Sequence, residues 1–294
     1  MKYAWIKNHL DSFRPSSMCK VLKVSRSGYY AWKKRKPSAQ AKRRKQIAKA
    51  VEESHDASKG TYGHRRIHTD VNEDYQIQCC EETVRQVMKD LGIQGKHKKA
   101  YVVTTDSDHN DPIAPNRLKR DFSSTAPNQK WLGDITYIRT MKGWLYLAVI
   151  LDCFSRKIVG WAMSPNIDAA LACDALNMAV FHRCPNDEVI CHSDRGKQYA
   201  SKAMRKIIKK HRFKTSMSRK GDPWDNAMME SFFGKLKTEW ADCIYKNHEE
   251  AKTDIFKYIE TFYNPIRRHS SLGNISPMEY ERRYETGKLT EKAA

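Results

Sequence analysis

The spacing of hydrophobic residues changes near residue 128 and divides the chain into two parts. Upstream, apolar residues recur every three or four positions, which is typical of amphipathic helices. This pattern predicts helices over 18–22, 25–32, 63–71 and 82–91. Ser25 is a suitable N-cap for the second helix, and Gly92 is a suitable C-terminal cap for the last. The first two helices predict a helix-turn-helix, although an ordinary helical hairpin with a basic rim fits the same pattern.

Downstream of residue 128, strand-like segments alternate with helical ones. Segment 144–152 is almost continuously apolar, which predicts a central strand buried on both faces. Strands are predicted over 131–139, 144–152, 156–163, 188–192 and 213–217. Helices are predicted over 168–182, 197–211, from 224 onward, and over 253–263. This order predicts an α/β layer built on a mixed sheet.

These patterns predict five segments along the chain. They are a helix-turn-helix-like DNA-binding segment at 1–50, a second helical DNA-binding segment at 51–100, a linker at 101–127, the α/β core at 128–240 and a C-terminal helical extension at 241–294. The linker is assigned because its residues are mostly Asp, Asn, Ser, Thr and Pro, with no regular period.

The excess of basic residues predicts a binding partner. The 294 residues include 54 Lys and Arg against 34 Asp and Glu, and the first 120 residues hold 26 of the basic ones against 13 acidic. Such an excess favours a polyanionic partner, most simply nucleic acid. The predicted DNA-contacting side chains in this half are Arg26, Lys33, Lys34, Arg65, Arg66, Lys98 and Lys99. A hydrophobic content of 40% excludes a disordered polycation.

The cellular compartment is predicted from features that the sequence lacks. The longest apolar run, 144–151, is far shorter than the roughly 18 residues that a membrane span requires. No secretory signal precedes the first helices, and the eight cysteines have no regular spacing. We expect a cytoplasmic, nucleoid-associated protein with reduced thiols.

Three acidic residues stand out in the downstream half: Asp134 on the first strand, Asp194 at the end of the fourth, and Glu230 in the helix after the fifth. Strand ends and a neighbouring helix can bring distant residues together. Clustered carboxylates favour hard cations such as Mg²⁺ or Mn²⁺, and two such ions can drive phosphodiester chemistry. Taken singly, each acid is better explained as a cap, turn or surface residue.

Zinc is not expected. His64 and His68 share a helix face near Cys79 and Cys80, but adjacent cysteines chelate a tetrahedral ion poorly.

Several long motifs resemble the OrfB-type transposases of the IS3 family of insertion sequences. They occupy 131–138, 151–161, 192–199, 216–226, 230–237 and 263–272, and the segments 25–32 and 63–67 resemble the helix-turn-helix region of the same proteins. The resemblance extends over nearly the whole chain.

This resemblance implies a ribonuclease H-like, retroviral-integrase-like catalytic core preceded by a helix-turn-helix region. It implies that Asp134, Asp194 and Glu230 are the catalytic metal ligands for two Mg²⁺, with Mn²⁺ as a substitute. It also implies that Lys237 holds DNA beside the metals. Asn226, one turn before Glu230, is expected to project the same way.

The expected activity is Mg²⁺-dependent strand cleavage and strand transfer by a DNA transposase, acting on the terminal inverted repeats and on target DNA. The expected partners are double-stranded DNA, further copies of the chain on that DNA, and an upstream OrfA-type protein or fusion. Arg267 and Arg268 lie in a predicted phosphate-contacting loop, for which a solvated turn is the alternative. Asp152 is interpreted as structural.

Two rival hypotheses remain at this point. One is a DNA-binding regulator derived from a transposase, which would have no need of the three acids. The other is a ribonuclease H or resolvase-like nuclease on the same fold, which leaves the basic amino-terminal half unexplained.

Overall fold

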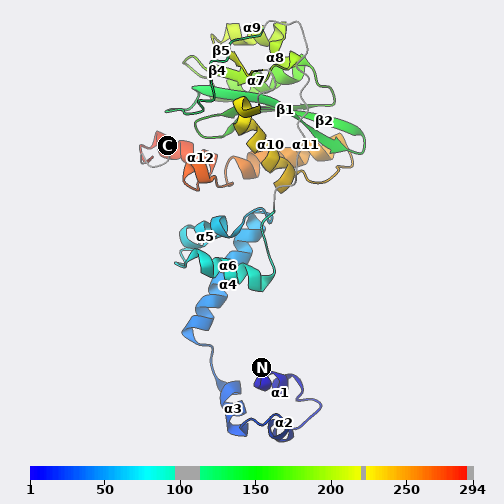
Figure 1. Cartoon of the computed structure of the whole chain (residues 1–294), viewed down its shortest axis with the longest axis vertical. Helices are drawn as coiled ribbons and strands as arrows, with labels where there is room; N and C mark the ends of the chain where they lie inside the picture. The colour runs from blue at the N-terminus through cyan, green and yellow to red at the C-terminus, as the bar shows by residue number, and fades with distance from the viewer. Residues whose placement is uncertain (97–112, 220–222, 290–294) are drawn as a thin grey trace.

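The computed structural model describes residues 1–96, 113–219 and 223–289. Figure 1 shows a small helical unit at the N-terminus, a second helical unit in the middle, and an α/β core with C-terminal helices at the far end.

The N-terminal unit consists of three short helices, α1 (Lys2–Asn8), α2 (Pro15–Val21) and α3 (Arg26–Lys34). The sequence pattern predicted α2 and α3 but not α1. Gly28 N donates a 3.2 Å hydrogen bond to Ser25 Oγ, which confirms the predicted N-cap of α3. The unit has its own small core, formed by Ile6, Met18, Cys19 and Tyr29.

The second unit consists of α4 (Ala39–Ala57), α5 (His64–Glu73) and α6 (Glu81–Leu91). Helix α4 runs without a break through residue 50, so the predicted boundary between the two helical segments is wrong. Four residues on one face of α4 are buried, Ile47, Ala50, Val51 and Ser54. Gly92 ends α6 with φ +68°, as the sequence predicted.

The core is built on a five-stranded sheet in the order β3-β2-β1-β4-β5. Its strands are β1 (Lys130–Thr140), β2 (Gly143–Asp152), β3 (Ile158–Ser164), β4 (Ile190–Ser193) and β5 (Lys214–Met217). The first three pair antiparallel, whereas β4 pairs parallel with both β1 and β5. The predicted mixed sheet is confirmed, and it brings the carboxyl end of β4 beside the middle of β1.

Helices cover both faces of the sheet (Figure 1). One face packs on α7 (Ala169–Arg183), α8 (Lys197–Ala200) and α9 (Lys202–Lys210). The other packs on α10 (Ala227–Glu239), α11 (His248–Phe256) and the π-helical turn η2 (Lys257–Tyr263). The 3-10 turns η1 (Pro223–Asn226) and η3 (Ser270–Leu272) and helix α12 (Pro277–Glu285) complete the chain. None of the helices in the described ranges is long and apolar enough to cross a membrane.

The described part of the predicted linker packs on the core. Leu118 is buried, and the backbone amides of Arg117 and Leu118 donate to Ser216 Oγ at 2.8 and 3.2 Å. Residues 113–121 therefore form a strap across β5 instead of a solvated connection.

The second helical unit packs against the C-terminal helices. Buried residues of α4–α6 share one hydrophobic cluster with residues of α10, α11 and η2. Tyr62 OH donates to Ile266 O at 3.2 Å and accepts from Arg268 N at 2.8 Å. We refer to this contact region as the junction.

Candidate active site

The sheet register places two of the predicted acids side by side. Gly133 on β1 is paired with Ser193 on β4, so Asp134 and Asp194 are the next residues on adjacent parallel strands. Adjacent strands lie about 4.8 Å apart, and residues at the same register position point to the same face. Gly133 faces Tyr199 of α8, and the alternation along β1 therefore turns Asp134 toward the opposite face, which α10 covers.

Asp194 is held by the turn that follows β4. Gly196 N donates to Asp194 Oδ1 at 2.9 Å. A side chain at Gly196 would meet that same oxygen at 3.0 Å and Gln198 Oε1 at 2.8 Å. The glycine thus lets the backbone approach the carboxylate closely and fix its direction.

Glu230 lies in the first turn of α10, which crosses the face of the sheet that carries Asp134. The pKa of Asp134 is raised well above its usual value, first by burial, then by the negative charge of Asp194 and, more weakly, of Glu230. Asp194 and Glu230 thus both act on Asp134 through space.

The neighbours of Asp134 include two further predicted residues. Asn226 Nδ2 donates to Asp134 Oδ2 at 3.1 Å, and Asn226 is 6% exposed. Its predicted contact with DNA is therefore corrected, because its amide is buried against the carboxylate. Lys237 Nζ lies 4.2 Å from the centre of the Tyr137 ring. Burial lowers the pKa of Lys237 to about 8, against the opposing attraction of Asp134.

The donor set at this site consists of carboxylate oxygens, which suit a hard divalent cation. Their mutual repulsion, seen in the raised pKa of Asp134, is the kind that a cation relieves. Within the described residues, no three His, Cys, Asp or Glu side chains are already arranged to hold one ion.

A residue that the sequence reasoning missed, Asp225, ties the site to its surroundings. Its side chain is fully buried and accepts from Arg219 N and Asn116 Nδ2, both at 2.9 Å, and from Arg120 Nε at 3.3 Å. Burial alone would raise the pKa of Asp225, but the hydrogen bonds from Arg219 and Arg120 hold it below its usual value. Asp225 thus joins the strap to the turn that presents Asn226.

His192 is a second residue whose role was not predicted. Ser216 Oγ already accepts two backbone amides from the strap, so its own proton goes to His192 Nδ1, 2.8 Å away. The proton of the neutral ring then lies on Nε2, which donates to Ser218 Oγ at 3.1 Å. Burial lowers the pKa of His192 to about 4 and keeps the ring neutral. This network fixes β4 and β5 just before Asp194.

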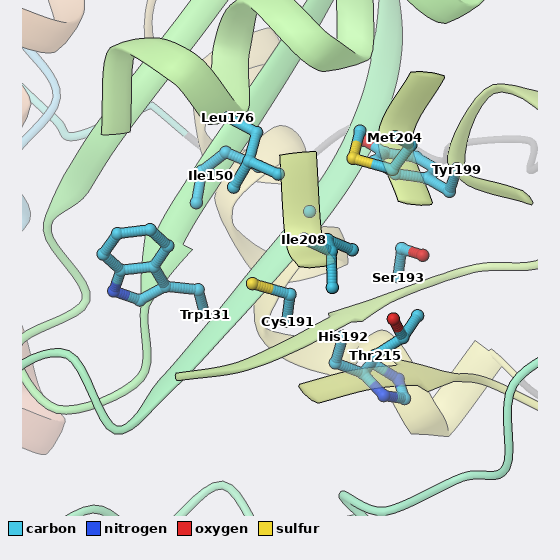
Figure 2. Close-up of a pocket in the computed structure, with 11 residues that line it drawn as sticks. Trp131, Ile150, Leu176, Cys191, His192, Ser193, Tyr199, Met204, Ile208 and Thr215 are labelled. Carbon is cyan, nitrogen blue, oxygen red and sulfur yellow. The ribbon is translucent and has the colours of Figure 1, made fainter. Parts of the chain in front are cut away.

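Figure 2 shows a small cavity on the other face of the sheet, beneath α7–α9. It is lined mainly by apolar side chains, among them Trp131, Ile150 and Leu176, and its volume of about 20 Å³ holds one water. Tyr199 lines it, and the pKa of this phenol is raised by burial, then by Asp134 and Asp194. The cavity is too small for a substrate, and the three predicted acids are not among the residues that line it.

The predicted DNA-contacting residues of the N-terminal half differ in their surroundings. Arg26, Lys33 and Lys34 are exposed on α3, as a contact with DNA requires. Arg65 is exposed on α5, although it bonds Glu81 at 3.3 Å. Lys98 and Lys99 lie outside the described residues.

The predicted phosphate contacts of Arg267 and Arg268 are wrong. Arg267 is 1% exposed and forms a two-pronged ion pair with Glu239. Arg268 bonds Asp70 at 2.6 Å, and Glu73 and Asp74 at 2.9 Å. Both guanidinium groups are used by carboxylates within the fold.

The residues weighed for zinc have other contacts. His64 Nε2 lies 2.9 Å from Glu81 Oε1, and His68 Nε2 lies 2.9 Å from Cys79 O. All eight cysteines lie in the described ranges as free thiols.

Comparison with known proteins agrees with the observed division into an α/β core and a helical region before it. The family description "Integrase core domain" matches residues 124–223 and again 211–277, and "HTH-like domain" matches 42–101. The HTLV-2 integrase catalytic core domain in complex with magnesium aligns at 18% identity over 54% of this chain and 99% of that chain. Its TM-score of 0.43 is too low to support an argument.

Two relatives match along nearly their whole length. The "Transposase InsF for insertion sequence IS3A" of Escherichia coli K12 is 41% identical over 96% of this chain and 98% of its own. The "Insertion element IS600 uncharacterized 31 kDa protein" of Shigella sonnei is 43% identical over 91% of this chain and 98% of its own. With an integrase core built on a mixed sheet and an HTH-like region before it, this chain belongs to the IS3 family of insertion-sequence transposases.

Proposed function

We propose that this transposase cleaves and joins DNA strands at the ends of its element, with Asp134, Asp194 and Glu230 as the ligands of two Mg²⁺ ions, for which Mn²⁺ can substitute. The observation that carries the proposal is the register that pairs Gly133 of β1 with Ser193 of β4, next to Asp134 and Asp194, on the sheet that α10 covers with Glu230 in its first turn. When bound, the divalent ions supply Lewis-acid activation of a water or sugar hydroxyl and stabilise the departing oxygen.

The residues around the acids prepare the site for this chemistry. Asn226 fixes the orientation of one Asp134 oxygen, and the Gly196 amide does the same for Asp194. Lys237 lies near Asp134, where its ammonium group can hold a phosphate beside the reacting bond. Phosphoryl transfer depends mainly on such positioning and charge stabilisation.

The wider expectation is a protein that grips duplex DNA with its helical units and assembles as several copies on the two element ends. Exposed cations on α3 support the grip on DNA. An upstream OrfA-type protein, as partner or fusion, is the proposed source of further terminal-repeat recognition.

Strand cleavage of labelled element-end duplex in the presence of Mg²⁺ tests the proposal. We expect Asp194→Asn and Glu230→Gln each to abolish cleavage and strand transfer while leaving DNA binding intact, because each removes a ligand charge but little volume. Asp187→Asn, at an exposed acid of the same core, is the matched control and should retain full activity.

Wild-type cleavage by either triad variant would show that the acids are assigned wrongly. Specific binding with no cleavage by the wild-type chain would favour the rival regulator. Cleavage of an RNA–DNA hybrid in preference to the element end would favour the ribonuclease H-like nuclease.

A further inference from the structure

The junction contains a charged cluster that the active site does not use. Four cations, Arg66, Arg156, Lys235 and Arg267, act electrostatically on His269. Among them, Lys235 is also attracted by the carboxylate of Glu239. Arg267 grips that carboxylate with Nε 2.6 Å from Oε2, and Arg66 Nη1 lies 4.0 Å from Oε1. Lys235 lies one turn before Glu239 on the same face of α10.

His269 lies inside this cluster. The residue is 2% exposed, and its Nε2 has no hydrogen-bond partner among the described residues. Its ring packs edge-on against Tyr263 with the ring centres 5.0 Å apart, and Tyr263 OH donates to Arg156 O at 3.1 Å. These contacts bring the end of the 263–272 motif, the turn before β3 and the end of α10 to one place.

Within this cluster both prongs of Arg267 occupy the carboxylate of Glu239. The carboxylates nearby on α5 and just after it, Asp70, Glu73 and Asp74, bond Arg268 instead. The pKa of His269 is held well below its usual value, first by burial and then by Arg267, Lys235 and Arg156. Burial and repulsion by Arg267 and Arg156 lower the pKa of Lys235 to about 8. Uncompensated like charges in a partly enclosed site favour an anion.

The location of the cluster suggests which anion. It lies where α10 of the core approaches α5 of the HTH-like unit (Figure 1). A duplex that bridges α5 and the core along this contact would bring its phosphates to the cluster. The side chain of Arg66 is 25% exposed, so the cluster is accessible from outside. Arg and Lys contacts to DNA phosphates fix the register of a protein on its duplex.

We propose that Arg156, Lys235 and Arg66 form a phosphate site that grips the DNA backbone at the junction, with His269 Nε2 facing the bound oxygen. This inference rests on the proposed function, because it takes DNA as the substrate. It assigns a role to Arg156, Lys235 and His269, which the active site leaves without one.

The test is binding of the full chain to a short duplex in EDTA, over a series of salt concentrations. We expect Lys235→Gln to weaken binding and to reduce the slope of log affinity against log salt by about 0.9, the loss of one phosphate contact. The same variant should match or exceed the wild-type Tm without DNA, because it removes a buried, repelled cation. Lys235→Arg should keep the wild-type slope.

Lys209→Gln, which removes the same charge from an exposed position on α9, is the matched control and should leave the slope unchanged. Arg156→Gln provides a second measurement and should reproduce the effect of Lys235→Gln. An unchanged slope in both cluster variants, or an equal loss in the control, would overturn the proposal. Since EDTA prevents cleavage, these results do not depend on whether Asp194 and Glu230 bind metal.

Discussion

At the scale of single residues, Asn226 connects the turn before α10 to the first acid on β1. Its Nδ2 donates to Asp134 Oδ2, while its own Oδ1 is buried without a hydrogen-bond partner among the described residues. A buried acceptor of this kind carries a desolvation cost. Its retention is consistent with a positioning role in the site rather than with packing alone.

We therefore expect Asn226→Ala to lower strand-cleavage activity by about 10- to 100-fold, the usual effect of removing a group that orients a metal ligand. DNA binding should be unchanged, and the Mg²⁺ concentration for half-maximal cleavage should rise. A metal titration of the cleavage rate checks this. Asn186→Ala, at an exposed amide, should behave as wild type. An unaltered Mg²⁺ requirement in Asn226→Ala would refute the positioning role.

Sequence reasoning selected the three acids because each lies in a long motif of a recognisable family. It predicted that Asn226, Arg267 and Arg268 contact DNA. The identity of a polar or basic residue does not show which partner its side chain binds. Arg267 has Glu239 as its partner, 28 residues earlier, and Arg268 has Asp70, 198 residues earlier. Such pairs follow from tertiary packing, which the local pattern does not contain.

At the scale of elements, helix α4 has a hydrophobic spacing that would have predicted it from the sequence, although no helix was predicted there. Its buried residues Ile47, Ala50, Val51 and Ser54 follow the i, i+3, i+4, i+7 spacing. The basic run Arg43–Lys45 in this segment was interpreted only for its charge. Strands β1, β2 and β3 were predictable because apolar and β-branched residues dominate them. The strap at 113–121 was not, because its polar composition is typical of a solvated linker.

The junction is held by individual side chains that reach between elements. Arg268, 11% exposed at its side chain, links the segment after η2 to Asp70 of α5. Asp70 also accepts from Ser54 Oγ at 2.6 Å, and burial raises its pKa in spite of that bond. Removing Arg268 would leave a buried carboxylate without its cation.

We expect Arg268→Ala to destabilise the docking of α4–α6 by about 3 kcal/mol, the lower end of the cost of breaking a buried ion pair. Backbone amides of α5 should then exchange hydrogen faster, while those of β1 should not change. Hydrogen exchange followed by mass spectrometry measures both. Arg65→Ala changes an exposed side chain of α5. This variant should leave the α5 amides protected from hydrogen exchange. Unchanged exchange in α5 after Arg268→Ala would contradict this account.

At the scale of the whole molecule, acid should unfold the protein partly through its buried histidines. His192 is neutral in the fold with a pKa of about 4, against an ordinary value of 6.5. The unfolded chain therefore binds more protons between these values, and stability must fall as pH decreases from about 6.5 to about 4. For this one residue the loss approaches about 3 kcal/mol.

Urea unfolding at a series of pH values checks this expectation. His192→Gln should be less stable than wild type at pH 7, because it loses the paired hydrogen bonds to Ser216 and Ser218. It should also lose less stability on acidification. His182→Gln, at an exposed histidine, should follow the wild-type curve, and equal pH dependence in all three proteins would rule out the contribution of His192.

The separate small core of α1–α3 has a consequence for how such elements diversify. Ile6, Met18, Cys19 and Tyr29 hold these helices together without side chains from the sheet, and residues 35–38 lead directly into α4. Substitutions on the outer surface of this unit should therefore leave the sheet and its carboxylates, some hundred residues later, undisturbed. Under the proposed grip of α3 on DNA, such substitutions would change the choice of DNA ends while the cutting machinery stays the same.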